Sequence, residues 1–442
     1  MSMMSIVSAV ARQFLGTMFF NAVFIAFYIL ILTFVKGKLE KQSDLRENAT
    51  GIPGKTTREM FEEIILVSLV SGFLISIAVV FIGISLDISA FQYLFLIMLA
   101  LFIINPRFVC FSYAGGLLAL IGIIFKVPGL NPASLIALIA IAHLAESVLI
   151  LLFGTNSIIP VYIKHENGIA GAFIIQKFWP LPLIFVASGI QSITAGGMEE
   201  FVKADWWPLF KSFSSFASSS ISTFTSTAAG IATSISASGG LALGLGSLAA
   251  FLSYSDMAVS SQPEDKGRER AYLDLGYAVL LFVVSFFARD SMALQIIGAL
   301  AAILAHEGIS LFGKLRENSR KPLFMAERRG LKVFDVAKGT HAHEMGMRRG
   351  DTVLNVNGRD IQSVEGLIET LKDYPNYLWV KVKTPDGAEK LLEHRSYPEG
   401  VNNLGILTIP REQEVTYNID YFENFAIIRN LVARFRAGNK PV

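Results

Sequence analysis

Four ionisable side chains lie inside long apolar stretches of the sequence, where charge is costly and usually serves a function. His143 and Glu146 are three residues apart, so a helix would place them on one face. His306 and Glu307 are neighbours in a later apolar stretch. If the two helices meet, these groups could bind a metal ion, line a polar or transport pathway, or pair across the bundle.

The zinc-binding motif of intramembrane peptidases is incomplete in this sequence. Site-2 proteases carry His-Glu-x-x-His on one helix, which supplies two imidazole ligands and a glutamate base. The matching run starts at His306 and Glu307, but Ser310 stands where the second histidine should be. We therefore expect interhelical pairing, with no enzymatic activity, no metal and no cofactor. The alternative is a metalloprotease-like or transporter function that uses His143, Glu146, His306 and Glu307.

Two other groups have types that could bind metals but are expected to be inert. Cys110 is the only cysteine, which excludes an internal disulfide and a zinc cluster of several thiolates. It falls in an apolar run and is expected to be a buried apolar side chain. His341 and His343 are two residues apart on a short predicted helix, so their side chains should point away from each other and into solvent.

The composition is that of a polytopic membrane protein. Of the 442 residues, 52% are hydrophobic and 17% are charged, whereas soluble proteins have about 25% charged residues. The mean hydropathy is +0.51. The net charge is only +2, which gives no field that would attract nucleic acid. The sequence thus excludes a plain cytosolic enzyme and a disordered chain, and it predicts a chain surrounded by the lipid bilayer.

We expect a helical bundle of about eight or nine spans, since a span takes roughly 20 apolar residues. The sixth run contains Pro180 and Pro182 and should be kinked or re-entrant. The seventh is rich in glycine and alanine and could be a close-packed span or a re-entrant segment. The predicted spans are residues 13–35, 61–86, 88–104, 108–127, 132–153, 174–190, 227–252, 273–287 and 292–312.

Basic segments predict the orientation, because lysine and arginine favour the cytoplasmic side. Three such segments lie at residues 36–58, 266–270 and 314–321, and nine spans would place all three on one side. This predicts an external N-terminus and a cytoplasmic C-terminal domain. With eight spans the N-terminus would move inside, and the last two basic segments would stay cytoplasmic.

The chain divides into a membrane domain (1–313), a basic linker (314–321), an α+β domain (322–411) and a C-terminal tail (412–442). The serine-rich segment 212–238 is either an external loop or an amphipathic segment on the membrane. Apolar residues recur in the tail at helical spacing. This spacing predicts a helix that packs on the α+β domain or lies on the membrane surface.

Short strands and turns replace the apolar runs after residue 330. Strands are predicted at 331–336, 352–356 and 377–384, a short helix at 341–347, and a longer helix at 364–372. Asn357-Gly358 is a strong hairpin turn. The run from Gly346 to Gly358 (Gly-Met-Arg-Arg-Gly-Asp-Thr-Val-Leu-Asn-Val-Asn-Gly) resembles the PDZ domains of bacterial proteins.

The resemblance implies a domain that binds an extended peptide, which adds a strand to a sheet edge beside a helix. The helix would be 364–372, and the peptide-binding loop would contain Asn403 and the residues after it, as in a circularly permuted PDZ domain. Arg329-Gly330-Leu331 is a weaker candidate loop. The groove could accept a free C-terminus or an internal segment, or the domain could only pack on the membrane domain. The expected groove residues are Leu404, Gly405, Ile406, Val364, Leu367, Ile368 and Leu371.

The whole arrangement, with many spans before one PDZ domain and no catalytic domain, resembles the MinJ-like family of Gram-positive bacteria. The resemblance implies a non-enzymatic scaffold in the bacterial cell membrane that helps to position cell division. Its expected partners are DivIVA-like and MinD-like proteins, and self-association is compatible with this role. An adaptor should need the groove, whereas an enzyme or transporter should need the intramembrane His and Glu residues.

Overall fold

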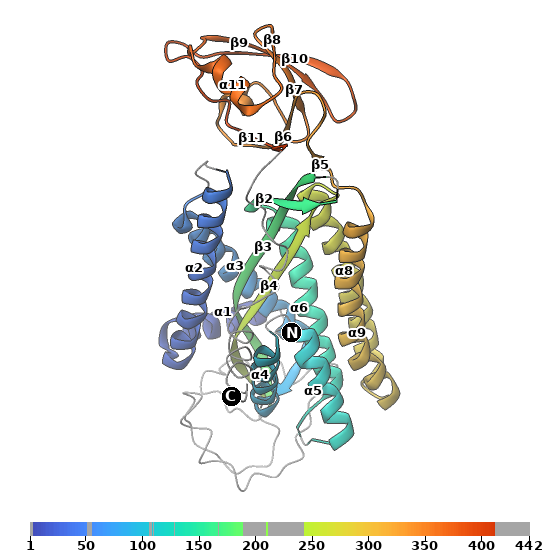
Figure 1. Cartoon of the computed structure of the whole chain (residues 1–442). Coiled ribbons are helices and arrows are strands. Elements are labelled where there is room, and N and C mark those ends of the chain that lie inside the picture. Colours follow the sequence, from blue (N-terminus) through green and yellow to red (C-terminus); the bar gives the residue numbers. More distant parts are fainter. Residues whose placement is uncertain are drawn as a thin grey trace, which may run out of the picture.

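The computed structural model describes residues 3–50, 55–105, 108, 110–127, 129–166, 168–188, 209–210 and 243–411. Helices stand side by side around a long β-ribbon, and a sheet domain built from the C-terminal residues sits at one end (Figure 1). The serine-rich segment 212–238 and the tail 412–442 lie outside the described residues.

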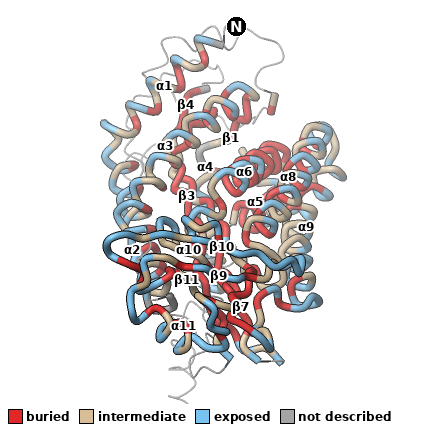
Figure 2. The backbone as a smooth tube through the Cα atoms, turned by 90° about the horizontal axis from the view of Figure 1, so that it is seen from above, coloured by how far each residue is buried: buried red, intermediate tan, exposed pale blue. Residues whose placement is uncertain are grey.

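Five of the described helices are long and apolar enough to cross a membrane: α2, α3, α6, α8 and α9. In α6, 72% of the apolar window is buried inside the protein, against 22% in α2 and 17% in α9. Viewed from above, α6 is largely red in Figure 2, which marks it as buried. The helices are α1 (Met3–Phe20), α2 (Ala22–Thr50), α3 (Thr57–Ile82), α4 (Ile88–Ile104), α5 (Phe111–Phe125), α6 (Pro132–Phe153), α8 (Pro263–Phe287) and α9 (Met292–Ser319).

Local capping signals set several helix ends. Thr56 begins α3 with a reciprocal capping box to Glu59, and Gly83 ends it with a positive φ of 70°. The expected span 13–35 is wrong in detail, because the chain breaks at Asn21 into α1 and α2. The Asn21 side chain accepts a hydrogen bond from the Phe24 amide at 3.0 Å, and this bond begins a new helix.

The sixth and seventh expected spans are wrong, because their described parts form strands. β3 (Gly168–Ser188) pairs antiparallel with β4 (Leu243–Ala258) along the whole of β4. Proline breaks a helix interior but is tolerated at a strand edge that needs no N–H donor. Pro180 and Pro182 are two residues apart in β3, so their backbone groups point to the same edge of the strand. The carbonyl of Pro180 points away from β4 and accepts a hydrogen bond from the Tyr28 hydroxyl. The missing N–H groups therefore fall on the edge that β4 does not use.

Helix side chains satisfy this second edge of β3. β2 (Ile158–His165) covers one end of the edge and β1 (Ser85–Asp87) covers the other. Between them, the Tyr28 hydroxyl donates to the Pro180 carbonyl at 2.9 Å, and the Ile184 amide donates to Ser76 Oγ at 2.8 Å. α3 approaches so closely that a Cβ on Gly72 would lie 2.5 Å from the Pro182 carbonyl oxygen. The ribbon can thus run among apolar helices without unpaired backbone groups at these positions.

The C-terminal sheet domain has its own core, which includes Val333, Val353 and Leu378. Its main strands follow the order β10-β9-β7-β6-β11, so β11 is at one end of the sheet. The strands predicted at 331–336 and 352–356 are found with those bounds. The elements are β6 (Leu331–Val336), α10 (His341–Glu344), β7 (Thr352–Val356), β8 (Arg359–Asp360), α11 (Val364–Leu371), β9 (Tyr377–Lys383), β10 (Glu389–Arg395) and β11 (Ile406–Thr408).

The expected linker 314–321 is largely helical, because α9 continues to Ser319. The next strand, β5 (Phe324–Met325), pairs with β3 in the membrane domain rather than with the sheet domain. Aromatic packing then joins the two domains, since the Phe173 ring lies 5.4 Å from the Phe324 ring and 4.6 Å from the Phe334 ring. The boundary between the domains is therefore a packed interface and not a loose connection.

Candidate functional site

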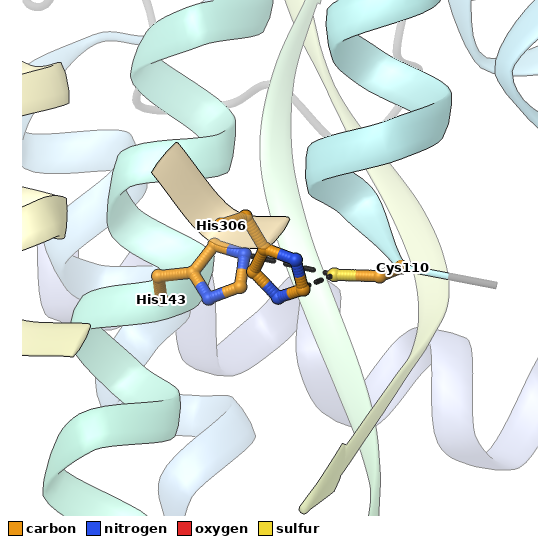
Figure 3. Close-up of side chains that lie close together, drawn as sticks. All are labelled: Cys110, His143 and His306. Atoms are coloured by element: carbon orange, nitrogen blue, oxygen red, sulfur yellow. Dashed lines mark hydrogen bonds between the residues drawn. The ribbon is translucent and has the colours of Figure 1, made fainter. Parts of the chain in front are cut away.

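Three helices bring a cysteine and two histidines together within the membrane domain (Figure 3). Cys110 precedes the first residue of α5, His143 lies halfway along α6, and His306 lies halfway along α9. The side chain of His143 is 1% exposed, while Cys110 and His306 are partly buried. All three point to a common centre, although 196 residues separate Cys110 from His306.

The distances within this cluster are short. Cys110 Sγ lies 3.7 Å from Nε2 of His143 and 3.7 Å from Nε2 of His306. One atom from each side chain can be chosen so that all three lie within 4.8 Å of one another. The two imidazole centroids are 5.1 Å apart. A thiolate and two imidazoles at such separations are a typical ligand set for a borderline-soft metal ion.

A chain of polar contacts extends from His143 on both sides. Its Nδ1 atom lies 3.0 Å from Glu146 Oε2, and its Nε2 atom lies 2.6 Å from Ser112 Oγ. Ser112 Oγ is 2.8 Å from the Tyr277 hydroxyl, which donates to the Ala302 carbonyl at 2.7 Å. The four contacts connect α5, α6, α8 and α9 through buried groups.

Counting protons shows that this chain of contacts has one too few. Each of the four contacts needs one hydrogen, but Tyr277, Ser112 and a neutral His143 supply only three. Because Tyr277 donates to a carbonyl, Ser112 must donate to Tyr277, and His143 Nε2 must donate to Ser112. A hydrogen bond from His143 Nδ1 to Glu146, which the 3.0 Å contact approaches without good geometry, needs a second proton. The four contacts together therefore require His143 to be an imidazolium ion or Glu146 to be protonated. A bound cation that takes the place of one contact would remove this requirement.

The structure brings together three of the four intramembrane residues singled out from the sequence. His143, Glu146 and His306 meet, whereas the carboxylate of Glu307 accepts a hydrogen bond from the Tyr113 hydroxyl. The sequence-based interpretation of Cys110 as an apolar residue is wrong, because its sulfur faces two imidazoles. No spacing motif could have revealed it, since the three residues come from three separate helices.

A second histidine cluster lies on the sheet domain. His341 Nδ1 is 2.8 Å from His394 Nε2, and Glu344 Oε2 is 3.8 Å from the same nitrogen. The expected separation of the His341 and His343 side chains is compatible with this arrangement. The sequence did not predict that His394 on β10 would be the partner of His341. The Glu344 side chain is 57% exposed and that of His394 is 11% exposed, so the cluster is partly buried beneath an exposed carboxylate.

The edge strand β11 has backbone groups that face away from the sheet. Ala337 N–H donates to the Gly405 carbonyl at 3.0 Å, and hydrogen-bonded pairs alternate along an antiparallel ladder. The N–H and C=O groups of Ile406 therefore point away from β6. No other described strand pairs with this edge of β11. At its far end, the Tyr162 hydroxyl donates to the Thr408 carbonyl at 2.8 Å.

The loop before β11 has a conformation that requires glycine. Gly405 has a φ of 76°, and a Cβ there would lie 2.4 Å from Thr340 Cβ. Its N–H group donates to Asn403 Oδ1 at 2.8 Å. A side-chain oxygen thus occupies the position where an external carboxylate oxygen could accept the same hydrogen bond.

The expected groove residues fall into two groups. Leu404, Leu367 and Leu371 are 1%, 6% and 2% exposed and pack in the domain core, so a ligand cannot reach them. Val364 and Ile368 on α11 are 37% and 61% exposed, and Ile406 is half-buried. Only the second group and the backbone of Gly405 can line a binding surface.

No family model matches the chain, and a search of curated proteins finds no match.

Proposed function

We propose that this protein is a non-enzymatic membrane adaptor whose C-terminal domain, a PDZ-like domain, recruits partner proteins at the membrane surface. The observation that carries the proposal is the outward-facing backbone of Ile406 in an edge strand. An extended peptide would add a strand there and gain main-chain hydrogen bonds. The exposed apolar side chains of α11 would contact alternate residues of the peptide.

The strand order supports a circularly permuted PDZ-like arrangement. The last strand in the sequence, β11, pairs with the first strand of the domain, β6. The loop before β11 then stands at the start of the binding edge, where such domains hold the end of a peptide. Leu404 from this loop and Leu367 from α11 belong to the same core, which fixes the loop relative to the helix.

The loop favours a partner with a free C-terminus. Gly405 N–H already binds a side-chain oxygen of Asn403, so its geometry suits an oxygen acceptor. A terminal carboxylate could displace Asn403 Oδ1 and bind more strongly, because charged acceptors form stronger hydrogen bonds. The bond from Tyr162 to Thr408 leaves a short open edge, which suits the last few residues of a peptide.

The position of the sheet domain supports a cytoplasmic location. It adjoins the N-terminal end of α8, where Arg349 of the domain pairs with Glu264 at 3.0 Å. The basic segment at the start of α8 is linked to the end of α9 through Lys266 and Glu317, 3.5 Å apart. The basic segments 266–270 and 314–321 thus lie at the end that carries the sheet domain, which the positive-inside rule assigns to the cytoplasm.

Membrane anchoring would allow the groove to recruit partners efficiently. An adaptor held at the inner leaflet meets other membrane-bound partners at a high effective concentration, so modest affinity suffices. The likeness to MinJ-like proteins makes DivIVA-like and MinD-like proteins the partners that we propose. Positioning of cell division would then follow from where those partners gather.

A peptide-binding experiment on the full chain tests the groove. The chain in lipid nanodiscs selects peptides from a random library displayed with free C-termini, and fluorescence anisotropy measures the affinity of the enriched peptides. We expect Ile368→Asp to weaken binding at least about tenfold, because it places a charge on the apolar face of the groove. Leu391→Asp is the matched control, since both side chains are 61% exposed and Leu391 lies on β10.

Amidation of the peptide C-terminus should also weaken binding if Gly405 N–H binds a carboxylate. Equal affinity of the Ile368→Asp and Leu391→Asp variants would refute the groove. A library from which the wild-type chain selects no peptide would also refute the groove.

A further inference from the structure

We propose that Cys110, His143 and His306 form a binding site for a zinc-class divalent cation that joins α5, α6 and α9 inside the membrane domain. The site is independent of the peptide groove, which lies in the other domain. It rests on the convergence of three side chains whose donor atoms all suit the same type of ion.

The donor set selects the class of metal. One thiolate and two imidazoles match zinc and similar divalent ions, whereas magnesium and calcium prefer oxygen ligands. Glu146 lies beside His143 Nδ1, and Glu307 accepts a hydrogen bond from the Tyr113 hydroxyl. Neither carboxylate is needed as a metal ligand.

The sulfur–nitrogen distances fit tetrahedral coordination. Bonds of about 2.3 Å to sulfur and about 2.05 Å to nitrogen put these ligand atoms about 3.6 Å apart. Both observed sulfur–nitrogen distances are 3.7 Å. The nitrogen–nitrogen distance is at most 4.8 Å, and tetrahedral geometry needs about 3.3 Å. Metal binding would therefore bring the two nitrogens closer by about 1.5 Å at most, through rotation of the imidazoles.

Glu146 is placed where a carboxylate can orient His143 as a metal ligand, with its Oε2 atom 3.0 Å from His143 Nδ1. Metal-bound histidines usually donate their other N–H to a carboxylate, which fixes the tautomer and raises the basicity of the ligand nitrogen. In His143, Nδ1 lies 3.0 Å from Glu146 Oε2 without a well-directed hydrogen bond, and Nε2 faces Cys110 and Ser112. The separation of three residues on α6 puts both groups on one face.

Metal binding also balances the protons and charges of the site. A cation on His143 Nε2 replaces the contact to Ser112, so a neutral His143 keeps its proton on Nδ1 for Glu146. Ser112 still donates to Tyr277, and every remaining contact has one hydrogen. A divalent cation offsets the charges of the thiolate and of the Glu146 carboxylate, which lowers the cost of burying them. The neighbouring Arg270 and Asp274 already pair with each other at 2.8 Å.

Three protein ligands leave a fourth position for water or a small anion. No described carboxylate is free to act as a base at that position, because Glu146 faces His143 Nδ1 and Glu307 binds Tyr113. The arrangement therefore suits a cross-link between helices rather than peptide hydrolysis. Such a cross-link would hold α9, whose last turns lead into the sheet domain.

Cobalt spectroscopy on the full chain tests the site directly. The protein is purified in detergent without a polyhistidine tag, and Co²⁺ is added. A tetrahedral site with a thiolate gives a sulfur-to-cobalt charge-transfer band and intense visible bands. We expect these bands in the wild type, their loss in Cys110→Ser, and their weakening in His306→Ala. The matched control is His341→Ala with His394→Ala, which removes the histidine cluster of the sheet domain and should leave the bands unchanged.

Alkylation of the single thiol gives a second readout that does not need a variant to fold. Because Cys110 is the only cysteine, the rate of reaction with a maleimide reports this site alone. A metal-bound thiolate should react several-fold more slowly than the same protein after treatment with a chelator, and added Zn²⁺ should restore the protection. Equal rates with and without Zn²⁺, or cobalt bands that survive in Cys110→Ser, would overturn the proposal in favour of an imidazolium–carboxylate pair.

Discussion

The charged side chain of Glu327 links separate parts of the sheet domain. Glu327 accepts hydrogen bonds from Lys332 Nζ at 2.9 Å and from Thr352 Oγ1 at 3.0 Å, which connects β6, β7 and the chain before them. Burial alone would raise the pKa of Glu327. The bonds from Lys332 and Thr352 outweigh this effect and hold the pKa below its ordinary value. The carboxylate therefore stabilises the folded domain in its ionised form.

This lowered pKa predicts an acid-dependent loss of stability. A carboxyl group whose pKa is lower in the folded state stabilises the fold above its unfolded pKa. That stability disappears as the pH falls through the folded pKa. We expect Glu327→Gln to lower the stability of the sheet domain by about 1 kcal/mol at neutral pH and by less in acid. Thermal unfolding of the full chain as a function of pH measures this, with the exposed Glu399→Gln as control. A loss that stays the same at low pH would contradict the role of the charge.

Cys110 illustrates what sequence patterns leave out at the scale of the residue. A pattern such as His-Glu-x-x-His reports ligands on one helix, where spacing determines direction. Here, the ligands come from three helices, and only packing brings them together. The pair His143 and Glu146 was predictable because both lie on α6. The sulfur was not, because its apolar neighbours favoured a buried thiol.

The β3–β4 ribbon is the element that most distinguishes this membrane domain from a helical bundle. Apolar composition does not separate a buried strand from a buried helix, so the hydropathy of residues 174–190 predicted the wrong type of element. Pro180 and Pro182 carried the correct signal, and the edge that they occupy is completed by α2 and α3. By contrast, α6 begins where Asn131 and Pro132 form a local N-cap, and it has its predicted bounds.

The ribbon should depend on the side chains that satisfy its edge. Ser76 is fully buried on α3, and its hydroxyl accepts from the Ile184 amide. Ser76→Ala leaves that amide unpaired in apolar surroundings, which should cost about 1–3 kcal/mol. Ser68→Ala is the control, because Ser68 is also fully buried on α3 but its hydroxyl has no hydrogen-bond partner among the described residues. Thermal unfolding in detergent compares the two, and equal losses would contradict the proposed role of Ser76.

At the scale of the whole molecule, the two domains share a continuous interface. Phe334 of the sheet domain packs on Phe173 of β3, and the Arg349 guanidinium lies 5.1 Å from the centre of the same ring. Arg349 also binds Asp335 at 2.6 Å, so one side chain connects β6 to the membrane domain. The strands β6, β7 and β9 were predictable because their signals are local, whereas β10 was not predicted. The docking of the sheet domain on β3 could not be predicted, since it depends on residues far apart in the sequence.

The most direct test of the proposed adaptor function is made in the native host with the Ile368→Asp variant. Membrane fractionation first verifies insertion, and then cell length and protein localisation are measured, with Leu391→Asp and Cys110→Ser strains alongside. The account predicts that Ile368→Asp loses its localisation at division sites and lengthens the cells, while Leu391→Asp behaves as the wild type. Normal cell length and localisation in a correctly inserted Ile368→Asp strain, together with failure of Cys110→Ser, would contradict it and place the function in the membrane domain.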